Sequence, residues 1–469
     1  MIDSSKHSHP TAIVVFGGTG NLTKTKLIPA LFDLYRRKML PQTFVIIGLS
    51  RKSLSHEEYR AFVREQLEAK GGDRDMQEIV DFCSHIQYIS GSSEEDSAYE
   101  DVRTELEAFD SRVGVCTNKL FYLAVTPNLY SGIFEKLKQS GVLSLCDSVG
   151  SWSRLLVEKP FGRDLETAKA LEERLCQILS EEQIYRIDHY LAKDAIENIT
   201  SLRFANSILS DSWKGTKIEA IELRLFESQD VSTRGSFYEE IGALRDVGQN
   251  HMLQMLALLT MHQAKDGSAA SVRASRLAAL TSLTMHGTDV AIRGQYKGYR
   301  DTVGVAEGSE TETYFKIETH LDSELWEDVK VTLESGKALH TSLAEAVVTF
   351  RPTDACTCDA ESVPHAHKNI LRIRFSPEQS IRLTMWVKEP GFGFVLRERE
   401  LTLTEEQGGG FRSPEAYERV LYDCIVGDQT RFVSGEEVVA AWEFITPILE
   451  SFKNLPLHVY EPGSEPPVV

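Results

Sequence analysis

The sequence contains no apolar stretch close to the ~20 residues that a membrane-spanning helix needs. Its N-terminus, from Met1 to Pro10, is polar and lacks the apolar segment of a secretion signal. The 7 cysteines follow no regular spacing, which favours a reducing compartment over a framework of disulfide bonds. We therefore expect a cytoplasmic protein without a membrane partner.

Basic residues are also scarce. The chain has 51 Lys and Arg against 70 Asp and Glu, and this net charge of -19 repels nucleic acid over long range. We expect no nucleic-acid partner, and any phosphate ligand must be held by basic residues concentrated in motifs. Apolar residues make up 42% of the 469 positions, which is typical of a chain that folds into two or three globular domains.

Two strand patterns divide the chain. In the first part, buried apolar runs alternate with helical segments, as in a parallel sheet. These runs are Ala12–Phe16, Thr43–Gly48, Lys119–Val125 and Leu155–Lys159. In the remainder, apolar and polar residues alternate, as in antiparallel strands with one buried face. These strands are Ile218–Leu225, Thr313–Thr319, Ala346–Phe350 and Ile370–Phe375.

The patterns predict an α/β domain over residues 1–185 and a β+α domain over residues 186–469. A sheet with one apolar face needs helices to cover it. Val247–Met261 and Pro414–Gly427 have the length and apolar spacing for that purpose, so we expect both helices on the second sheet.

A glycine-rich turn joins the first predicted strand to a helix. Gly17 and Gly20 lack a Cβ atom, so the backbone can approach a pyrophosphate at the positive end of that helix. Thr23 stands where the usual fingerprint has its third glycine, which makes the match incomplete. The turn favours a dinucleotide-binding Rossmann domain, and a turn without a ligand is the alternative.

The end of the second strand indicates which dinucleotide is bound. Arg51, with Ser50 and Lys52 beside it, presents a cation where an NAD-binding site would present an acid. A guanidinium group suits the 2′-phosphate of NADP. We therefore predict NADP as the cofactor, with NAD possible. A solvated basic loop is the alternative interpretation.

The segment Arg186–Lys193 combines groups that suit a phosphate with one that does not. His189 and Lys193 are four residues apart, so a helix starting here would place both on one face, and Tyr190 adds a hydroxyl donor. Asp188 would repel the same anion. We therefore expect Asp188 to orient a histidine that acts as a general base.

His251 is the candidate for that base, because polar residues including Asp246 precede it at the start of an otherwise apolar helix. A core histidine with satisfied hydrogen bonds is the alternative. Lys159 ends a predicted parallel strand at its carboxyl edge, where ligands of such sheets bind, although an ordinary turn with a solvated lysine is also possible.

Two cysteines and two histidines in one polar segment could form a tetrahedral zinc site. They are Cys356, Cys358, His365 and His367. Their spacing is not one of the common zinc patterns, and the segment also contains other polar residues. We therefore expect no metal.

Five segments in the same order resemble the glucose-6-phosphate dehydrogenase family. They are Gly17–Lys26, Glu158–Gly162, Arg186–Lys193, Arg245–His251 and Ser335–Leu339. The resemblance covers nearly the whole chain. It implies a Rossmann domain followed by a β+α domain whose large, mainly antiparallel sheet forms the interface of a homodimer or a dimer of dimers.

The resemblance also implies roles for single residues. His251 would be the general base and Asp188 its partner. The ligands of the sugar phosphate group would be His189, Tyr190 and Lys193, and those around the sugar would be Lys159, Glu227, Asp246 and Lys337. The cofactor side would be formed by Gly17, Gly20, Arg51, Tyr130 and Lys159.

The implied reaction moves a hydride from C1 of a hexose 6-phosphate, foremost β-D-glucose 6-phosphate, to NADP and gives the 6-phospho-1,5-lactone. Two departures touch the sugar pocket. Leu343 replaces a second phosphate-binding lysine, and Ser376 replaces a glutamine. One lost charged hydrogen bond costs about 1.5–3 kcal/mol of binding. A modified sugar phosphate, such as an amino sugar, therefore stays open as the substrate.

Two further alternatives remain. One is another NADP-dependent sugar oxidoreductase, in the manner of the glucose-fructose oxidoreductase family. The other is a non-catalytic relative with a regulatory role. The presence of both Asp188 and His251 argues against each of them.

Overall fold

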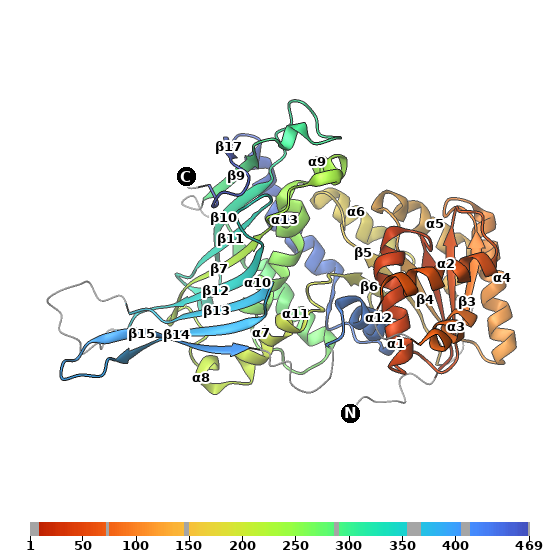
Figure 1. Ribbon diagram of the computed structural model, residues 1–469, viewed down its shortest axis with the longest axis horizontal. Coiled ribbons are helices and arrows are strands. Elements are labelled where there is room, and N and C mark those ends of the chain that lie inside the picture. The colour runs from red at the N-terminus through yellow and green to blue at the C-terminus, as the bar shows by residue number, and fades with distance from the viewer. Residues whose placement is uncertain are drawn as a thin grey trace.

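The computed structural model describes residues 9–71, 75–144, 150–285, 290–353, 367–404 and 413–467. Within this part of the chain, a smaller parallel sheet and a larger mixed sheet lie side by side, with helices packed between and around them (Figure 1). Of the zinc candidates, Cys356, Cys358 and His365 lie outside the described residues, and His367 is described.

The first sheet has the strand order β3-β2-β1-β4-β5-β6-β16 among the described residues. Its members are β1 (Thr11–Phe16), β2 (Phe44–Ser50), β3 (Ile86–Ser90), β4 (Asn118–Leu123), β5 (Ser153–Glu158), β6 (Ile184–Ile187) and β16 (Phe432–Val433). Every pairing is parallel except that of β16 with β6. The buried runs predicted as parallel strands are thus confirmed, and the sheet has the order of a Rossmann fold.

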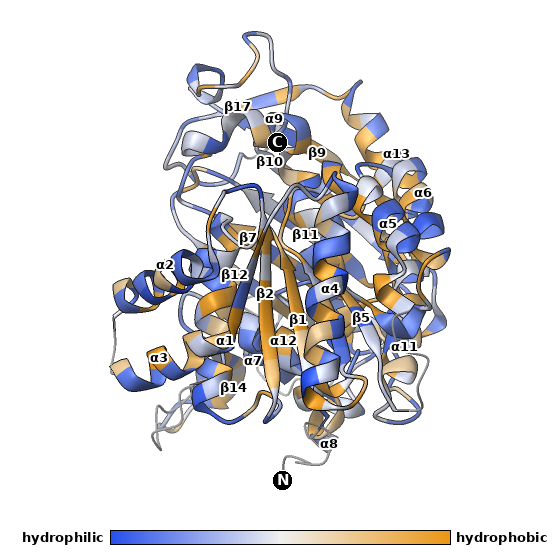
Figure 2. Cartoon of the chain, turned by 90° about the vertical axis from the view of Figure 1, so that its right-hand side faces the viewer, coloured by the Kyte–Doolittle hydropathy of each residue, from blue (hydrophilic) through white to orange (hydrophobic). Residues whose placement is uncertain are grey.

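Helices cover both faces of this sheet because its central strands are apolar on both sides. Figure 2 shows the apolar strands β1 and β2 between helices whose outward faces are hydrophilic. The helices are α1 (Ile28–Arg36), α2 (His56–Ala69), α3 (Met76–Ser84), α4 (Asp96–Val113), α5 (Tyr130–Ser140) and α6 (Leu165–Cys176). The strand order reverses between β1 and β4, and such a switch point leaves a crevice at the carboxyl ends of the strands.

The second sheet has the order β15-β14-β13-β12-β7-β11-β10-β9-β17, with β8 pairing β10 beside this path. Its strands are β7 (Ile218–Phe226), β8 (Leu283–Thr284), β9 (Ala291–Tyr296), β10 (Tyr314–Leu321), β11 (Lys330–Gly336), β12 (Leu343–Phe350), β13 (Ile370–Ser376), β14 (Ser380–Lys388), β15 (Leu396–Thr404) and β17 (Leu457–Tyr460). Among the described pairings, only β11 with β7 and β17 with β9 are parallel. The prediction of a large, mainly antiparallel sheet is confirmed.

One predicted covering helix lies on the second sheet and the other does not. Val247–Met261 continues as α10 (Leu253–Thr260) against the second sheet, together with α7 (Asp194–Phe204), α9 (Gly235–Ala243) and α11 (Ala269–Thr281). The expectation for Pro414–Gly427 was wrong. This helix, α12 (Ala416–Val426), packs beside α1 on the first sheet, because Val420, Leu421 and Ile425 join the apolar cluster of β1 and β4 (Figure 1).

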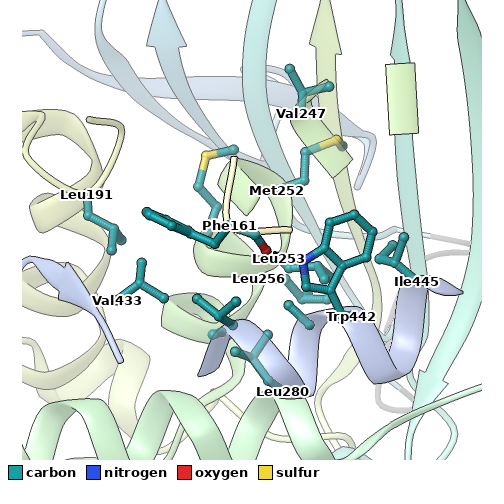
Figure 3. Close-up of a cluster of buried hydrophobic side chains, with 14 of the residues drawn as sticks. Phe161, Leu191, Val247, Met252, Leu253, Leu256, Leu280, Val433, Trp442 and Ile445 are labelled. Carbon is teal, nitrogen blue, oxygen red and sulfur yellow. Dashed lines mark hydrogen bonds between the residues drawn. The ribbon is translucent and has the colours of Figure 1, made fainter. Parts of the chain in front are cut away.

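Helix α13 (Gly435–Phe452) joins the two parts through a shared apolar cluster. Trp442 lies in this cluster with Phe161 and Leu256, and its indole Nε1 donates a 2.8 Å hydrogen bond to the carbonyl oxygen of Phe161 (Figure 3). The short helix α8 (Ser207–Ser210) follows α7. Because the core is continuous, the two parts hold the residues of a cleft between them in a defined arrangement.

Residues from both sides of position 185 contribute to the first sheet. Strand β6 spans that position, and β16 returns to the same sheet from near the C-terminus. Cys116 is disulfide-bonded, whereas Cys83, Cys176 and Cys424 are free. None of the described helices has the length and apolar character required to cross a membrane.

Candidate active site

A cleft of about 750 Å³ opens at the carboxyl ends of the first sheet, at the switch point between β1 and β4. It reaches from the glycine turn to the start of the second part. The predicted site residues that line it are Gly17, Gly20, Ser50, Arg51, Lys159, His189 and Asp246. Tyr130 is not among them, because it is buried and its hydroxyl donates a 2.9 Å hydrogen bond to the backbone oxygen of Glu158.

The glycine turn has the form that a dinucleotide requires. Gly17 has a φ of +84°, and a Cβ atom there would lie 2.3 Å from the carbonyl oxygen of Ala124. The hydroxyl of Thr23 donates a 2.8 Å hydrogen bond to the carbonyl oxygen of Gly17. Thr23 therefore closes the turn from within, although it replaces the third glycine of the usual fingerprint. The bare backbone at the cleft fits a pyrophosphate.

Polar side chains gather at the tip of β2. Ser50 Oγ lies 2.9 Å from Thr19 Oγ1 and 2.8 Å from the hydroxyl of Tyr88. The next residue, Arg51, is exposed at the cleft rim. Tyr88 also donates to the backbone oxygen of Lys52 at 2.5 Å, so the loop that carries Arg51 is held on both sides.

His251 and Asp188 form a buried pair behind the cleft. His251 Nδ1 lies 2.5 Å from Asp188 Oδ1, and the two side chains are only 2% and 3% exposed. The backbone N–H of Tyr190 donates to the same carboxylate oxygen at 2.9 Å. With Nδ1 occupied by Asp188, Nε2 is the ring nitrogen left to accept a proton. The sequence prediction of this pair agrees with the geometry.

The two members shift each other's proton affinity. Burial alone would raise the pKa of Asp188, but the adjacent His251 ring and its hydrogen bond hold that pKa well below its ordinary value. Burial lowers the pKa of His251, against the opposing pull of Asp188. An ionised Asp188 beside a neutral His251 is the arrangement that a general base needs.

The phosphate-binding candidates converge through turns rather than along a helix. The prediction of a helix over 189–193 was wrong, because α7 begins only at Asp194. Successive turns, closed by Leu191 N to Asp188 O and Lys193 N to Tyr190 O, precede it. These turns place Lys193 Nζ 3.5 Å from the centre of the Tyr190 ring.

Aromatic rings then connect this group to the buried pair. The Tyr190 ring stacks on His251 with centroids 4.3 Å apart, and the His189 ring meets His251 edge-on at 4.7 Å. Burial first, and then electrostatic coupling to the titrating His251 ring, lower the pKa of His189 to about 3, and burial lowers the pKa of Lys193. His189 is therefore neutral, and Lys193 is the cationic side chain of this group. Asp188, His189 and His251 also present ligand atoms within 4.8 Å of one another.

Four residues from different elements form a charged network beside His251. Lys159 Nζ donates a 2.7 Å hydrogen bond to the backbone oxygen of Asp246 and lies 3.6 Å from its carboxylate. Lys337 Nζ lies 3.5 Å from the other Asp246 oxygen and forms an ion pair with Glu227. Burial would raise the pKa of Asp246, but the two lysines lower it. This network presents both hydrogen-bond donors and acceptors, as a sugar requires.

A π-helical segment, η7 (Leu244–Met252), carries both Asp246 and His251. These residues are five apart, which in an α-helix of 3.6 residues per turn would leave their side chains about 140° apart. A π-helix bonds each residue to the fifth along, so positions five apart lie close together. The π-helix follows a break in α9 at Gly242, whose φ is +71°. At its first residue, the N–H of Leu244 donates a 3.0 Å hydrogen bond to the carboxylate of Glu312.

Sequence reasoning missed Glu158 and two phenols that donate hydrogen bonds to it. Tyr122 on β4 donates a 2.6 Å hydrogen bond to the carboxylate of Glu158, and Tyr417 on α12 donates to the same carboxylate. Glu158 and Tyr417 both line the cleft. Glu158 belongs to the segment Glu158–Gly162 and could have been singled out there, whereas nothing near Tyr417 in the sequence pointed to this site.

Comparison with known proteins agrees with this geometry. Residues 14–198 match the family model "Glucose-6-phosphate dehydrogenase, NAD binding domain", and residues 200–469 match "Glucose-6-phosphate dehydrogenase, C-terminal domain". The chain belongs to the glucose-6-phosphate dehydrogenase family. Its first part is therefore a domain that binds a nicotinamide dinucleotide.

Relatives in this family cover almost the whole chain. A glucose-6-phosphate 1-dehydrogenase of Chlamydia muridarum is 33% identical over 95% of this chain and 91% of its own length. That of Treponema pallidum is 35% identical over 97% and 92%. A solved glucose-6-phosphate dehydrogenase in complex with its substrate glucose-6-phosphate is 32% identical, with a TM-score of 0.90 over 98% of this chain and 96% of that one.

The two departures from the glucose-6-phosphate dehydrogenase pattern lie in different surroundings. Leu343 begins β12, is partly buried and packs against the apolar core. The preceding Ser342 instead accepts a 3.0 Å hydrogen bond from the backbone N–H of Ser228, next to Glu227. Ser376 is exposed at the end of β13. The polar side chain that reaches the segment of Glu227 is thus Ser342 rather than Leu343.

Proposed function

We propose that this protein oxidises a hexose 6-phosphate, foremost β-D-glucose 6-phosphate, at C1 with NADP and yields the 6-phospho-1,5-lactone. The observation that carries the proposal is the buried His251–Asp188 pair at the end of a dinucleotide cleft, with Nδ1 and Oδ1 2.5 Å apart. Membership of the glucose-6-phosphate dehydrogenase family supports the same reaction.

In this proposal each group of residues has one task. His251 Nε2 takes the proton of the C1 hydroxyl, and Asp188 holds Nδ1 and stabilises the imidazolium that results. His189, Tyr190 and Lys193 bind the phosphate, and Lys159, Glu227, Asp246 and Lys337 surround the sugar. When bound in the cleft, the nicotinamide supplies the hydride acceptor. Proton removal and hydride loss at C1 together leave the neutral lactone.

In this proposal the cofactor is NADP rather than NAD, because Arg51 and Ser50 at the tip of β2 would bind its 2′-phosphate. Gly17 and Gly20 would lie at the pyrophosphate. Lys159 is shared between cofactor and sugar, because it lies between their two ends of the cleft. Tyr130 acts on the cofactor side indirectly, through its hydrogen bond to Glu158.

The assay that tests the function follows the absorbance of reduced cofactor with NADP or NAD against phosphorylated, amino and unphosphorylated sugars. Rapid reduction with glucose 6-phosphate supports the proposal. A clear preference for an amino or otherwise modified sugar phosphate would replace the substrate. A preference for unphosphorylated sugars would favour another sugar oxidoreductase, and no reduction with any sugar would favour a regulatory relative.

Arg51→Gln is expected to raise the KM for NADP by about 10- to 100-fold, because a charged hydrogen bond contributes about 1.5–3 kcal/mol. The KM for NAD should change little, since NAD has no 2′-phosphate. Steady-state kinetics with both cofactors measure the difference, and Lys52→Gln provides a matched control at the neighbouring exposed position. Equal losses with NADP and NAD would remove Arg51 from the 2′-phosphate site.

The rate should fall on the acid side only below about pH 6.5, the ordinary pKa of histidine. His251 accepts a proton only when neutral, and burial lowers its pKa. In Asp188→Asn the anion that raises this pKa is gone, so the acid limb of log kcat/KM should move to lower pH while the plateau drops. A pH profile of both proteins measures this. Movement of the limb to higher pH would contradict the assignment.

We also propose a homodimer, or a dimer of dimers, formed through the second sheet. On the face directed away from the core, Glu345 is 4% exposed and lies 3.4–3.8 Å from Arg224, Arg372 and Arg374. An ordered charged face suits a polar interface. Light scattering coupled to size exclusion measures the mass, and a monomer would contradict the proposal. We further propose that the protein is cytoplasmic, which cell fractionation tests.

A further inference from the structure

We propose that one internal water molecule lies behind the His251–Asp188 pair, where it donates hydrogen bonds to both Asp188 Oδ2 and Gln254 Oε1. Gln254 is then a positioning residue for the general base, because it acts on His251 through the water and Asp188. This role of Gln254 rests on the proposed function, whereas the water site is argued from the geometry of the buried side chains.

The carboxylate of Asp188 has one oxygen with partners and one without. Oδ1 accepts a 2.9 Å hydrogen bond from the backbone N–H of Tyr190 and lies 2.5 Å from His251 Nδ1. Oδ2 is buried, and no residue that the structure describes donates a hydrogen bond to it. A buried oxygen of an ionised group is costly without a donor, so Oδ2 requires one.

Gln254 presents a second buried acceptor near the same base. It lies at the start of α10, three residues after His251, and is 3% exposed. Its Oε1 is buried as well and accepts no hydrogen bond within the described part of the chain. The same cost of an unsatisfied polar group therefore applies to Gln254.

A small cavity joins the two residues. Asp188 and Gln254 both line it, and its volume is about 20 Å³. A single water molecule needs roughly 10–15 Å³, so the cavity has room for one water and for nothing much larger. Phe161 and Val433, which Figure 3 draws within the apolar cluster, belong to the apolar part of its wall.

Water is the ligand that these side chains require. Two acceptors cannot hydrogen-bond to each other, so the group between Asp188 Oδ2 and Gln254 Oε1 has to donate to both. A water molecule has two O–H donors, and its oxygen can accept from the amide of Gln249, which is buried in the same wall. Glu437, also in the wall, is already paired with Arg276, whose Nε lies 2.7 Å from its carboxylate.

The water influences the base through charge. The His251–Asp188 pair carries one negative charge while His251 is neutral and none once the ring is protonated. A hydrogen bond to Asp188 Oδ2 stabilises the charged state and so lowers the proton affinity of the pair. The water thereby keeps His251 free to accept the substrate proton at lower pH. The other titratable groups that face the pair or its cavity are Glu158, Lys159, His189, Lys193, Asp246 and Glu437.

The first experiment is a crystal structure of the full-length wild-type protein at a resolution that shows ordered water. We expect an electron-density peak in the cavity at hydrogen-bond distance, about 2.5–3.0 Å, from both Asp188 Oδ2 and Gln254 Oε1. A cavity without such a peak would overturn the proposal, and this result does not depend on any variant.

The second experiment uses Gln254→Met, which keeps the length of the side chain and removes the acceptor. Crystals of the variant should lack the peak. The acid limb of log kcat/KM should move to higher pH by about one unit, the size expected for one lost charged hydrogen bond. This shift is opposite to the one expected for Asp188→Asn. Calorimetry should give a nearly unchanged Kd for the sugar phosphate. An acid limb that stays in place would overturn the proposal.

Gln295→Met is the matched control for the loss of a buried amide. Gln295 lies in β9, is 4% exposed and donates hydrogen bonds to the backbone oxygens of Ser309 and Thr311. This variant should lower thermal stability and leave the acid limb in place. Equal shifts of the limb in both variants would show a general effect of lost packing and would also overturn the proposal. If wild type oxidises no sugar, the proposed function fails, and the density in the cavity still decides the water site.

Discussion

His251→Asn is expected to lower kcat by about 10²–10⁴ while leaving the affinity for the sugar phosphate nearly unchanged, because the variant removes the group that takes the C1 proton. Asparagine keeps the polarity of the site and part of its volume but has no basic nitrogen. Asp188, whose Oδ1 lies 2.5 Å from His251 Nδ1, would keep an amide within reach of its carboxylate. Steady-state kinetics and calorimetry with the sugar phosphate measure the two effects separately.

A matched histidine provides the control for this substitution. His262 is exposed just beyond the end of α10, so His262→Asn should change kcat little. A His251→Asn enzyme that keeps turnover within about tenfold of wild type would show that the base lies elsewhere. A large loss of sugar-phosphate affinity would instead assign His251 to binding.

Lys193→Met is expected to raise the KM for the hexose 6-phosphate by about one to two decades and to leave turnover of the unphosphorylated sugar nearly unchanged. In the proposed phosphate site Lys193 would be the positive group, since burial first and then neighbouring side chains lower the pKa of His189 to about 3 and keep its ring neutral. Methionine retains the length of the side chain and removes only the charge. Comparison of the two sugars isolates the contribution of the phosphate.

Lys297→Met is the control for a lost surface charge. Lys297 is two-thirds exposed and pairs with Glu461, far along the chain from the cleft residues. The Lys297→Met variant should leave the KM values for the phosphorylated and the unphosphorylated sugar unchanged. An equal rise for the phosphorylated and unphosphorylated sugars in Lys193→Met would show that the lysine supports the local structure and does not bind the phosphate.

The proposed phosphate site shows how much can be inferred from local sequence. The spacing of His189 and Lys193 predicted a shared helix face, but turns rather than a helix connect the two residues. Spacing alone cannot distinguish these cases, because two successive turns and one helical turn can carry the chain through a similar distance. The pairing of His251 with Asp188, by contrast, was predicted from chemistry. A carboxylate next to a site for an anion would repel that anion, so Asp188 was expected to orient a histidine instead.

The second covering helix illustrates a limit of another kind. Pro414–Gly427 was recognised as an amphipathic helix, yet its apolar face is compatible with either sheet. Its place beside α1 is decided by β16, which follows it and pairs with β6 at the edge of the first sheet. Such an assignment depends on contacts between segments almost 250 residues apart, and these leave no periodic signal.

The sequence by itself determined the buried strands of the first sheet, the glycine turn at Gly17 and the acid–histidine pair, because each depends on local periodicity or on the chemistry of single side chains. Only the tertiary structure decided the π-helical register that carries Asp246 and His251, the packing of Leu343 against the core, and the hydrogen bonds from Tyr122 and Tyr417 to Glu158. Each of these is set by packing between distant elements, where close-packed neighbours admit one arrangement. The sequence therefore predicted the reaction but not the arrangement of the side chains around the cleft.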